Sequence, residues 1–387
     1  MTELFIAKKH ITERKRQSLI SIFGVALGVI VLTVSIGIAN GLNKNLIDNI
    51  LSITSHIFIS NYGRIENYNE LKEKIEQIPG VKGVVPTIET QGIVKHNGPY
   101  GVYVAGTRIE GYQLKSVFKA MELDKKIIEG EIKTDQIDGI LIGKELYKII
   151  GGQIGDEIII ISSENREISF KLTGVFQSGY YDYDVNMVVL PLEATQYLMQ
   201  SGDVVNKINI MLNNPYKANE IRDKIVEVTE MEAKTWGELN KNLLAALSLE
   251  KTVMILVFSL IVIIAGFVVW VTLNMLVREK IKDIGIMRAM GFSKGSIMKI
   301  FLFQGIILGL IGIIIGLLVS FCILWYLKNN TLEFVSSIYY LTKIPIEIST
   351  MEVIYISAAN IVVIFMSSIF PAYRASKMDT VEALRYE

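Results

Sequence analysis

Four long apolar runs stand out in the pattern of hydrophobic and polar positions along the chain. They cover residues 19–39, 253–277, 300–327 and 353–369, and none contains Asp, Glu, Lys or Arg. A helix needs ~20 apolar residues to cross the hydrocarbon core of a bilayer. The first three runs reach that length, and polar flanking residues can complete the fourth. The pattern therefore predicts four transmembrane helices.

The remaining residues divide the chain around these spans. We predict an α-helical membrane protein with four transmembrane helices and a large α+β extracytoplasmic domain inserted between spans one and two. The predicted segments are 1–17 (cytoplasmic amphipathic segment), 18–40 (span one), 41–250 (extracytoplasmic domain), 251–277 (span two), 278–299 (cytoplasmic loop with a short helix), 300–327 (span three), 328–350 (short extracytoplasmic loop), 351–370 (span four) and 371–387 (cytoplasmic tail).

Within residues 56–230 the pattern alternates between period two and helical spacing, which predicts two lobes of mixed strands and helices. Span one is expected to continue as a helix beyond the membrane before the first strand. The predicted strands are 56–60, 92–94, 101–106, 157–161, 168–173, 187–190 and 207–212. The predicted helices are 68–77, 145–149, 192–199, 215–229 and 236–250, with a further short helix at 379–386.

Basic residues predict the orientation of the spans. They gather at 8–16, at 278–299 and at 374–385, whereas the loop between spans three and four carries only Lys328 and Lys343. Both termini and the 278–299 loop are therefore expected in the cytoplasm. A cleaved signal peptide is the alternative for the N-terminus, because 37–39 has a small-x-small pattern, but the apolar run is longer than the ~7–15 residues typical of one.

The amino-acid composition limits the kinds of functional site that this chain can contain. The chain has 387 residues, 51% of them hydrophobic, no net formal charge and one cysteine, Cys322, so no internal disulfide is possible. The spans contain no ionisable group of the kind that proton and ion pathways use, which argues against a secondary transporter. The histidines, His10, His56 and His96, are scattered without metal-ligand spacing, so no metal site is predicted.

Two segments resemble catalytic or binding motifs only faintly. Residues 139–145 are one residue shorter than a phosphate-binding loop and end in Glu145 where Ser or Thr belongs. Asp182 and Asp184 could hold a cation or act as a carboxylate pair, but a solvated loop is the favoured interpretation. We therefore predict no catalytic residues and no enzyme activity on this chain.

Residues 278–291 form the most informative stretch outside the spans. Ile281, Ile284, Met287 and Met290 recur every three residues, which predicts a short helix with an apolar stripe. Gly291 suits its C-terminal end, and Ser293 suits the N-cap of the next helix. A helix this short is marginal alone in water, so its stripe is expected against the membrane surface or another protein. A simple linker between two spans is the alternative.

Glycines in the spans offer close helix contacts. Gly24 and Gly28 form a small-xxx-small pair in span one, and span three carries Gly305, Gly309 and the two glycines that follow at similar spacing. The pair in span one predicts packing either within the subunit or between two subunits.

The order of one span, a large outer domain and three further spans resembles the FtsX-like permeases of ABC transporters. This group contains MacB and the LolC/LolE subunits of lipoprotein release, and the likeness to LolC/LolE is the greater and covers the whole chain. The residues that carry it are Ile38-Ala39-Asn40-Gly41-Leu42, Asp48-Asn49-Ile50-Leu51, Thr235-Trp236-Gly237-Glu238-Leu239-Asn240, Leu249-Glu250-Lys251, the 278–291 stretch, Ile338-Tyr339-Tyr340-Leu341, Ile344-Pro345-Ile346-Glu347, Phe370-Pro371-Ala372-Tyr373-Arg374-Ala375 and 381–387.

This resemblance implies a subunit of the inner (cytoplasmic) membrane that works with an identical or homologous second permease and two copies of a separate ATPase. ATP and Mg would bind to that partner, and the chain itself would hold no cofactor. The 278–291 helix would be the coupling helix. The implied ATPase-coupling residues are Lys280, Ile281, Asp283, Ile284, Gly285, Ile286, Met287, Arg288, Ala289, Met290 and Gly291.

The same resemblance implies lipoproteins of the outer leaflet as the substrate, released by ATP-driven movement of the outer domains. We expect the lipid tails to be gripped where spans one and two leave the membrane. The predicted groove residues are Leu32, Ser35, Ile36, Ala39, Leu42 and Leu46 on the first helix and Leu247, Met254, Val257, Phe258 and Ile261 on the second.

The resemblance leaves three functions open, and a membrane-anchored binding domain with inert spans is the alternative outside the family. Lipoprotein release is the first of the three. LolC-type proteins capture a periplasmic lipoprotein carrier with an extended loop, whereas the corresponding turn here spans only 162–166. A MacB-like efflux permease is a second possibility, although such proteins usually carry the ATPase on the same chain. An FtsX-like regulator of cell-wall hydrolases is a third.

Overall fold

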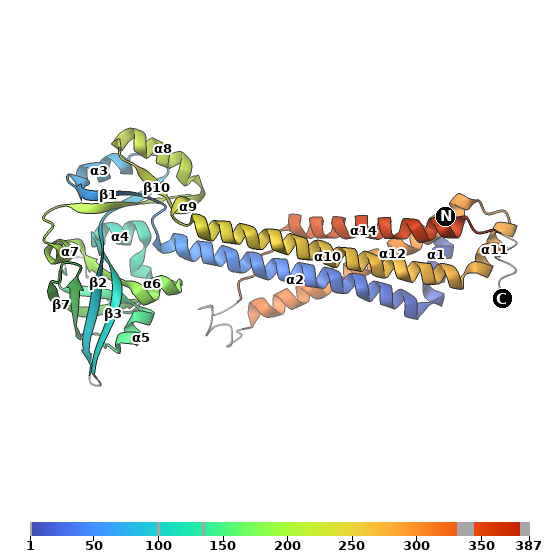
Figure 1. Ribbon diagram of the computed structural model, residues 1–387, viewed down its shortest axis with the longest axis horizontal. Coiled ribbons are helices and arrows are strands. Elements are labelled where there is room, and N and C mark those ends of the chain that lie inside the picture. Colours follow the sequence, from blue (N-terminus) through green and yellow to red (C-terminus); the bar gives the residue numbers. More distant parts are fainter. Residues whose placement is uncertain (1, 99–100, 134–135, 331–343, 380–387) are drawn as a thin grey trace. The chain divides into compact units, whose positions relative to one another are not determined.

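The computed structural model describes residues 2–98, 101–133, 136–330 and 344–379 (Figure 1). The chain divides into two compact units, one formed by Met1–Lys44 and Ala246–Glu387 and the other by Asn45–Ala245. The predicted helix at 379–386 and the Tyr339-Tyr340 motif lie outside the described residues.

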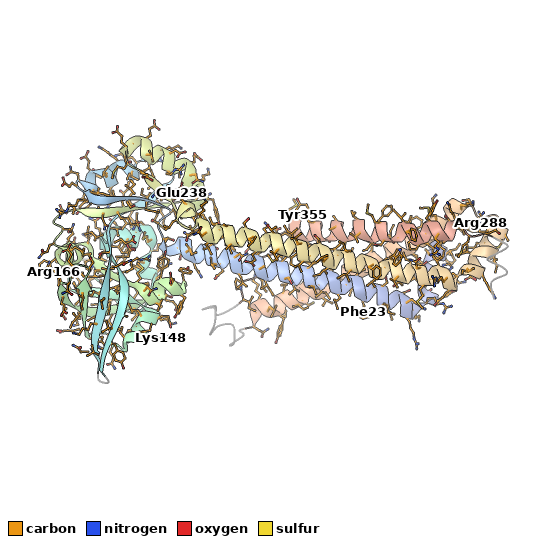
Figure 2. All side chains as sticks on the ribbon, viewed as in Figure 1. Phe23, Lys148, Arg166, Glu238, Arg288 and Tyr355 are labelled. Atoms are coloured by element: carbon orange, nitrogen blue, oxygen red, sulfur yellow. The ribbon has the colours of Figure 1, made fainter. Side chains whose placement is uncertain are left out.

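The first unit is helical. Among the described residues, four of its helices are long and apolar enough to cross a membrane, in agreement with the number of predicted spans. Large apolar side chains such as Phe23 and Tyr355 project from its outer surface, where a bilayer would meet them (Figure 2). The helices are α1 (Thr2–Glu13), α2 (Lys15–Ile53), α10 (Lys241–Glu279), α11 (Ile281–Ala289), α12 (Lys294–Asn329) and α14 (Thr350–Ser376), with α2 and α10 continuing into the second unit.

Glycines allow α12 to pack closely against two other helices. A Cβ atom added at Gly309 would lie 2.6 Å from Ile364 Cδ1 of α14, and one added at Gly312 would lie 2.8 Å from Val25 Cβ of α2. A buried cluster that includes Val25, Val269 and Ile364 fills the space between these helices. Because lipid and helix surfaces are equally apolar, this close fit is what holds spans together.

The second unit, which we call the outer domain, is built on one mixed sheet of ten strands in the described residues. Its order is β10-β1-β9-β2-β3-β8-β5-β7-β4, with β6 paired to β2 and β7. The strands are β1 (Ile57–Ile65), β2 (Val81–Gly98), β3 (Gly101–Tyr112), β4 (Ile127–Gly130), β5 (Gly139–Gly143), β6 (Glu157–Ser162), β7 (Glu167–Phe176), β8 (Met187–Pro191), β9 (Val205–Leu212) and β10 (Ala233–Thr235).

The long strand β2 joins the two predicted lobes, because its first half pairs with β9 and its second half pairs with β6. The sequence analysis had predicted only 92–94 of this strand, and Pro86 and Gly92 are both residues that usually weaken a strand. Pro86 is accommodated beside Ile208, and Gly92 is required because a Cβ there would lie 2.6 Å from both Ile109 Cδ1 and the Ile161 carbonyl oxygen.

Short helices cover the sheet and enclose three apolar cores. Most were predicted, but the helices α4 and α6 and the strands β4, β5 and β10 were not. The helices are α3 (Tyr68–Glu76), α4 (Leu114–Met121), α5 (Lys144–Ile150), α6 (Tyr181–Asn186), α7 (Leu192–Met199), α8 (Ala218–Thr229) and α9 (Trp236–Leu239), with 3₁₀ turns at Leu123–Lys126 and Pro215–Lys217. The predicted helix 236–250 is interrupted at Asn240, between α9 and α10.

Candidate functional site

The predicted coupling helix is α11, and its boundaries follow from local sequence signals. Gly291 adopts a left-handed φ of 94°, which ends the helical path after Met290. Ser293 then caps α12, with its hydroxyl oxygen accepting a hydrogen bond from the Ser296 backbone N–H at 3.1 Å. Both predicted signals are confirmed.

The direction of the apolar stripe corrects the interpretation of that helix. Ile284 is fully buried and Met287 is 7% exposed. Both belong to a buried cluster with Ala7 of α1, Phe301 of α12 and Ala372 of α14. The chain's own helices thus receive the stripe that the sequence analysis expected against the membrane surface or another protein. Gly285 is buried with them.

The opposite face of α11 is the one that a partner can reach. Ile286 is 49% exposed and Met290 is 67% exposed, and Lys282 and Ala289 are exposed beside them. Positions i, i+4, i+7 and i+8 lie on one face of a helix, so these four side chains form one surface. We call Lys282, Ile286, Ala289 and Met290 the outward face.

Ion pairs fix the start of α11 to the N-terminal helices. Lys280 Nζ lies 2.8 Å from Glu13 Oε2 and 2.7 Å from Asp283 Oδ2. Arg14 Nε lies 3.3 Å from Glu279 Oε2. Lys280 and Asp283, both predicted to contact an ATPase, therefore already have charged partners within this chain. Arg288 Nη1 donates to the Phe292 carbonyl oxygen at 3.0 Å, across the turn that ends α11.

The predicted groove residues of α2 and α10 are only partly available. Leu32 is 3% exposed and packs with Ile36, Phe258 and Ile261 in a cluster that α14 also joins. Val257 is 47% exposed and faces outward. The remaining predicted groove residues are half-buried, namely Ser35, Ala39, Leu42, Leu46, Leu247 and Met254, and Leu46 belongs to the outer unit.

The Gly24 and Gly28 pair packs within the chain. A Cβ on Gly24 would lie 2.7 Å from Val268 Cγ1, and one on Gly28 would lie 3.4 Å from Ala265 Cβ. Both neighbours belong to α10 of the same chain, so the pair supports packing within the subunit. The interpretation of this pair as a subunit contact is corrected accordingly.

Gly41 marks a close contact between α2 and the segment before α14. The Pro345 carbonyl oxygen lies 1.9 Å from where a Cβ on Gly41 would stand, so only glycine fits. The Glu347 N–H donates to the Gly37 carbonyl oxygen at 3.0 Å, and Lys44 Nζ lies 2.6 Å from Glu347 Oε1. Two of the family-like motifs are thus in contact.

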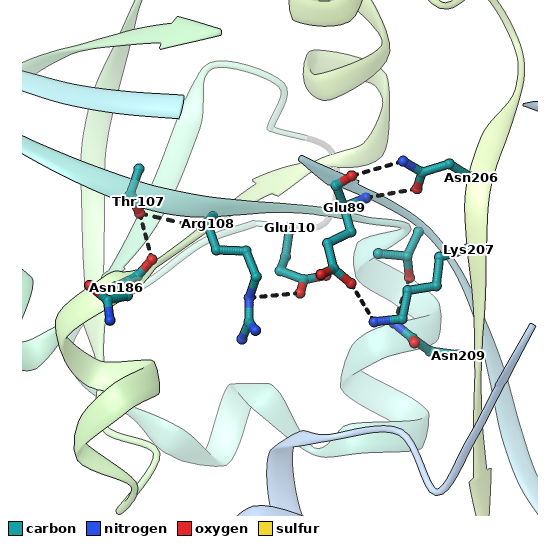
Figure 3. Close-up of polar contacts among 9 residues, drawn as sticks. Glu89, Thr107, Arg108, Glu110, Asn186, Asn206, Lys207 and Asn209 are labelled. Carbon is teal, nitrogen blue, oxygen red and sulfur yellow. Dashed lines mark hydrogen bonds and ion pairs between the residues drawn. The ribbon is translucent and has the colours of Figure 1, made fainter. Parts of the chain in front are cut away.

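The outer domain contains a polar site that the sequence analysis missed. Lys207, Glu89, Glu110 and Arg108 form a charged row across β9, β2 and β3 (Figure 3). Lys207 pairs with Glu89, and Arg108 Nε lies 3.2 Å from Glu110 Oε1. The signal available was the alternation of polar with apolar residues in each strand, which is equally typical of a solvated face.

The pKa values of the two carboxyl groups in the row are shifted in opposite directions. Glu110 is 4% exposed, and burial raises its pKa above the usual range despite Lys207 and Arg108. Burial also opposes ionisation of Glu89, but Lys207 holds the Glu89 pKa below its usual value. The row therefore favours one ionised carboxylate beside one carboxyl that resists ionisation.

The two faint motifs have structural explanations. Gly143 ends β5, and a Cβ on it would lie 2.3 Å from the Asp184 carbonyl oxygen, so its glycine serves packing. Asp184 is fully buried in α6 and accepts a hydrogen bond from the Ser178 N–H at 2.6 Å, so the solvated-loop interpretation is wrong for it. In the part of the chain that the structure describes, no cluster of His, Cys, Asp and Glu has metal-binding geometry.

Comparison with known protein families shows two matches along the chain. The family of MacB-like periplasmic core domains matches residues 18–228, and the FtsX-like permease C-terminal family matches residues 255–380. The first match covers more than half of the chain, so the chain belongs to the MacB-like periplasmic core domain family, with an FtsX-like permease part after it.

Individual relatives are similar along their whole length. "Lipoprotein-releasing system transmembrane protein LolC" of Xylella fastidiosa is 26% identical over 96% of this chain and 94% of its own length. LolC of Neisseria meningitidis is 25% identical over 100% and 99%, and LolE of Haemophilus influenzae is 24% identical over 99% and 99%. The periplasmic region of MacB from Actinobacillus actinomycetemcomitans covers 51% of this chain and 97% of its own, at 11% identity and a TM-score of 0.35.

Proposed function

We propose that this chain is the transmembrane permease subunit of an ABC transporter that releases lipoproteins from the outer leaflet of the inner membrane. The observation that carries the proposal is the end-to-end similarity to LolC and LolE proteins, which includes both the spans and the outer domain. A likeness confined to either part would fit any FtsX-like permease equally well.

The arrangement in the membrane follows from the charge pattern. We propose an inner-membrane protein with cytoplasmic termini, a cytoplasmic α11 and a periplasmic outer domain, since the basic residues at 8–16 and 278–299 favour the cytoplasmic side. Cysteine accessibility would test this orientation. A cysteine at Lys282 should react with a membrane-impermeant maleimide only in inside-out vesicles, and one at Lys148 only in right-side-out cells.

The energy source would be a partner. We propose that the chain is not itself an enzyme, and that ATP and Mg²⁺ bind a separate ATPase subunit, two copies of which act with this chain and a second permease, identical or homologous. ATP-driven movement of the outer domains would release the lipoprotein. A periplasmic lipoprotein carrier is a further candidate partner.

The outward face of α11 is the proposed ATPase contact. Ile286→Asp with Met290→Asp should place two charges in an apolar contact and uncouple ATP hydrolysis from lipoprotein release, while the chain still inserts and folds. The measurement is lipoprotein release per ATP hydrolysed in proteoliposomes that contain the chain and its ATPase.

Matched variants separate coupling from folding. Ile286→Leu with Met290→Leu keeps the apolar surface and should couple normally. Ile284→Asp puts a charge into the chain's own core and should lower the free energy of unfolding by roughly 3 kcal/mol or more. The yield of folded protein should fall as a result. Coupling at the wild-type level in the Ile286/Met290 double Asp variant would contradict the assignment of this face.

The lipid groove must use surfaces that the chain leaves open. We propose that an acyl chain lies against the outward side of α10 around Val257, because Leu32, Ile36, Phe258 and Ile261 already fill the contact between α2 and α10. An acyl chain gains about 0.8 kcal/mol per buried CH₂ in the groove but also in the bilayer, so entry and exit can both be easy.

Photocrosslinking would locate the groove. A probe at Val257 should capture lipoprotein, and a probe at Phe258, one residue away and turned inward, should capture much less. A probe at Met366 of α14 is the control for random capture from the bilayer. Equal capture at all three positions would argue against a groove beside α10.

Release, efflux and hydrolase regulation make different predictions. Depletion of the chain should accumulate mature lipoproteins in the inner membrane if it releases them. Unchanged lipoprotein sorting with loss of drug export would favour a MacB-like efflux permease. Unchanged sorting with defects in cell-wall cleavage would favour an FtsX-like regulator.

A further inference from the structure

The charged row lies on one face of the outer domain's sheet, and the alternation of each strand explains why. Ile57, Ile208 and Ile88 point into the apolar core beneath α3 and α8. The residues between and beside them, which include Phe58, Lys207 and Glu89, point to the opposite face because successive side chains alternate. The row therefore forms a polar patch on the face opposite that core, beside another apolar core that includes Val85, Tyr112 and Met211.

Within this polar patch, Glu89 and Glu110 are direct neighbours across β2 and β3. Like charges placed opposite each other destabilise a sheet. Lys207 on one side and Arg108 on the other compensate, with side-chain exposures of 17% for Lys207 and 34% for Arg108. Burying such a row rarely adds stability compared with apolar residues, which makes the row a candidate functional site.

The row borders a cavity of about 500 Å³ within the outer domain, a size typical of small-molecule sites. Its polar wall includes the row together with Asn206, Asn209 and Gln91. Its apolar wall is formed by Ile53, Phe58, Met121, Met187 and Leu239. The cavity therefore offers both a charged wall and an apolar wall to one occupant.

Arg108 is the group in the row that is free to bind. Only its Nε faces Glu110, and Figure 3 shows its terminal nitrogens pointing away from that carboxyl group. Figure 3 marks no contact between these two nitrogens and the other residues drawn, and Arg108 also hydrogen-bonds the Tyr183 side chain. The Tyr183 ring lies 4.6 Å from Arg108 Cζ and holds the guanidinium plane in place.

The two carboxyl groups are already engaged or buried, although the Glu89 side chain is about as exposed as that of Arg108, at 35% and 34%. Glu89 is paired with Lys207, and Glu110 Oε2 is buried without a hydrogen-bond partner among the described residues. A cation entering the cavity would have to displace Lys207 or reach an inaccessible oxygen. An anion could instead meet the two terminal nitrogens of the half-buried Arg108, whose fork matches the two oxygens of a carboxylate or phosphate.

We propose that this cavity binds a small amphiphilic anion, with its carboxylate or phosphate on the Arg108 fork and its apolar part against Met121 and Met187. The proposal concerns the outer domain alone and does not depend on the transport function proposed above. A carboxylate and a phosphate share the chemistry that Arg108 recognises, so the test includes both.

The test is methyl NMR on the full chain in nanodiscs, with ¹³C-labelled methionine methyl groups. The probes are butyl phosphate, butyrate and uncharged butanol, and Met121→Leu and Met187→Leu assign the two resonances. We expect saturable shifts of both resonances with butyl phosphate or butyrate and none with butanol. Saturation by only one of the two anions would identify the preferred headgroup.

Variants tie the binding to Arg108. Arg108→Gln should weaken anion binding about tenfold or more, because a charge-assisted hydrogen bond is lost. Arg108→Lys keeps the charge next to Glu110 but loses the fork, so it should fold normally and bind with intermediate affinity. Arg166→Gln is the matched control, since Arg166 also lies over a tyrosine ring, Tyr197, and does not line the cavity (Figure 2).

Several outcomes would overturn the proposal. One is the absence of saturable shifts of Met121 and Met187 in the wild type with either anion at millimolar concentration. A second is equal binding of butanol, which would show that the cavity recognises only apolar groups. A third is wild-type affinity in both Arg108 variants, provided that their ligand-free spectra match the wild type.

Discussion

The helical unit and the outer domain bury their polar groups in different ways. In the helical unit, several buried hydroxyl and amide groups bond to their own helix. Ser320 Oγ donates to the Gly316 carbonyl oxygen at 2.6 Å, and Asn360 Nδ2 donates to the Ile356 carbonyl oxygen at 2.8 Å. A neutral group satisfied four residues back needs no partner on another helix.

In the outer domain, buried polar groups bond across strands. Asn209 Nδ2 donates to Thr87 Oγ1 at 2.9 Å, and the charged row joins three strands. These pairs exist only in one strand register, since a shift by one residue would turn every side chain to the other face. The helical unit thus depends on shape, and the outer domain depends on register and charge.

The largest expected effect concerns shape. Gly41→Ala would force a methyl group onto the Pro345 carbonyl oxygen, a backbone atom that cannot move like a side chain. We expect a loss of about 3 kcal/mol or more and a marked fall in Tm of the full chain in nanodiscs.

Gly295→Ala is the matched control for Gly41→Ala in the same unit. The Ser293 Oγ atom, at 3.8 Å, is the nearest atom to a Cβ added there. Because alanine favours a helix over glycine, this change should be neutral or stabilise by up to about 1 kcal/mol. Equal Tm values for the two variants would show that the Gly41 contact does not hold the helical unit together.

An intermediate effect is expected for charge. Lys207→Met removes the cation that pairs with Glu89, which lies directly opposite Glu110. We expect a loss of about 2–3 kcal/mol, below the value for a fully buried pair because Glu89 is 35% exposed. Native-state hydrogen exchange of the β9 amides in the full chain would measure it.

Lys234→Met is the control for Lys207→Met. Lys234 is 53% exposed on the edge strand β10, and its nitrogen lies 3.7 Å from Glu232. Such a surface pair contributes little, so the expected change is within about 0.5 kcal/mol. If Lys207→Met behaved like this control, the row would not need its cation for stability.

The smallest effect is a dependence on pH. Burial lowers the pKa of Lys126 from 10.5 to about 8, and its Nζ donates to Ser52 Oγ at the outer end of α2. The unfolded chain therefore binds more protons than the folded chain between these two values, and stability rises with pH over that window. The gain should be about 1–2 kcal/mol after allowance for solvent screening.

Comparison with Lys126→Met isolates this contribution. The variant should lose the rise in outer-domain stability between pH 8 and pH 10.5 that is due to this residue, as measured by hydrogen exchange corrected for intrinsic rates. Parallel pH profiles for the two proteins would mean that Lys126 titrates normally in the folded state.

Much of the local structure could be predicted because its causes are local. The helix α11 is determined by the spacing of its apolar residues, by Gly291 and by the Ser293 cap, all within a few residues of one another. The strand β2 could not be predicted in full, because the partners that accommodate Pro86 and Gly92 come from β9, β3 and β6.

The sequence alone determined the four spans, because an uncharged run of sufficient length is favourable in a bilayer whatever its neighbours are. It also determined the position of α11 between two of them. Only the tertiary structure decided which face of α11 is open, because α1, α12 and α14 compete with any partner for Ile284 and Met287. Likewise, the charged row of Lys207, Glu89, Glu110 and Arg108 exists only once three strands distant in sequence pair in one register.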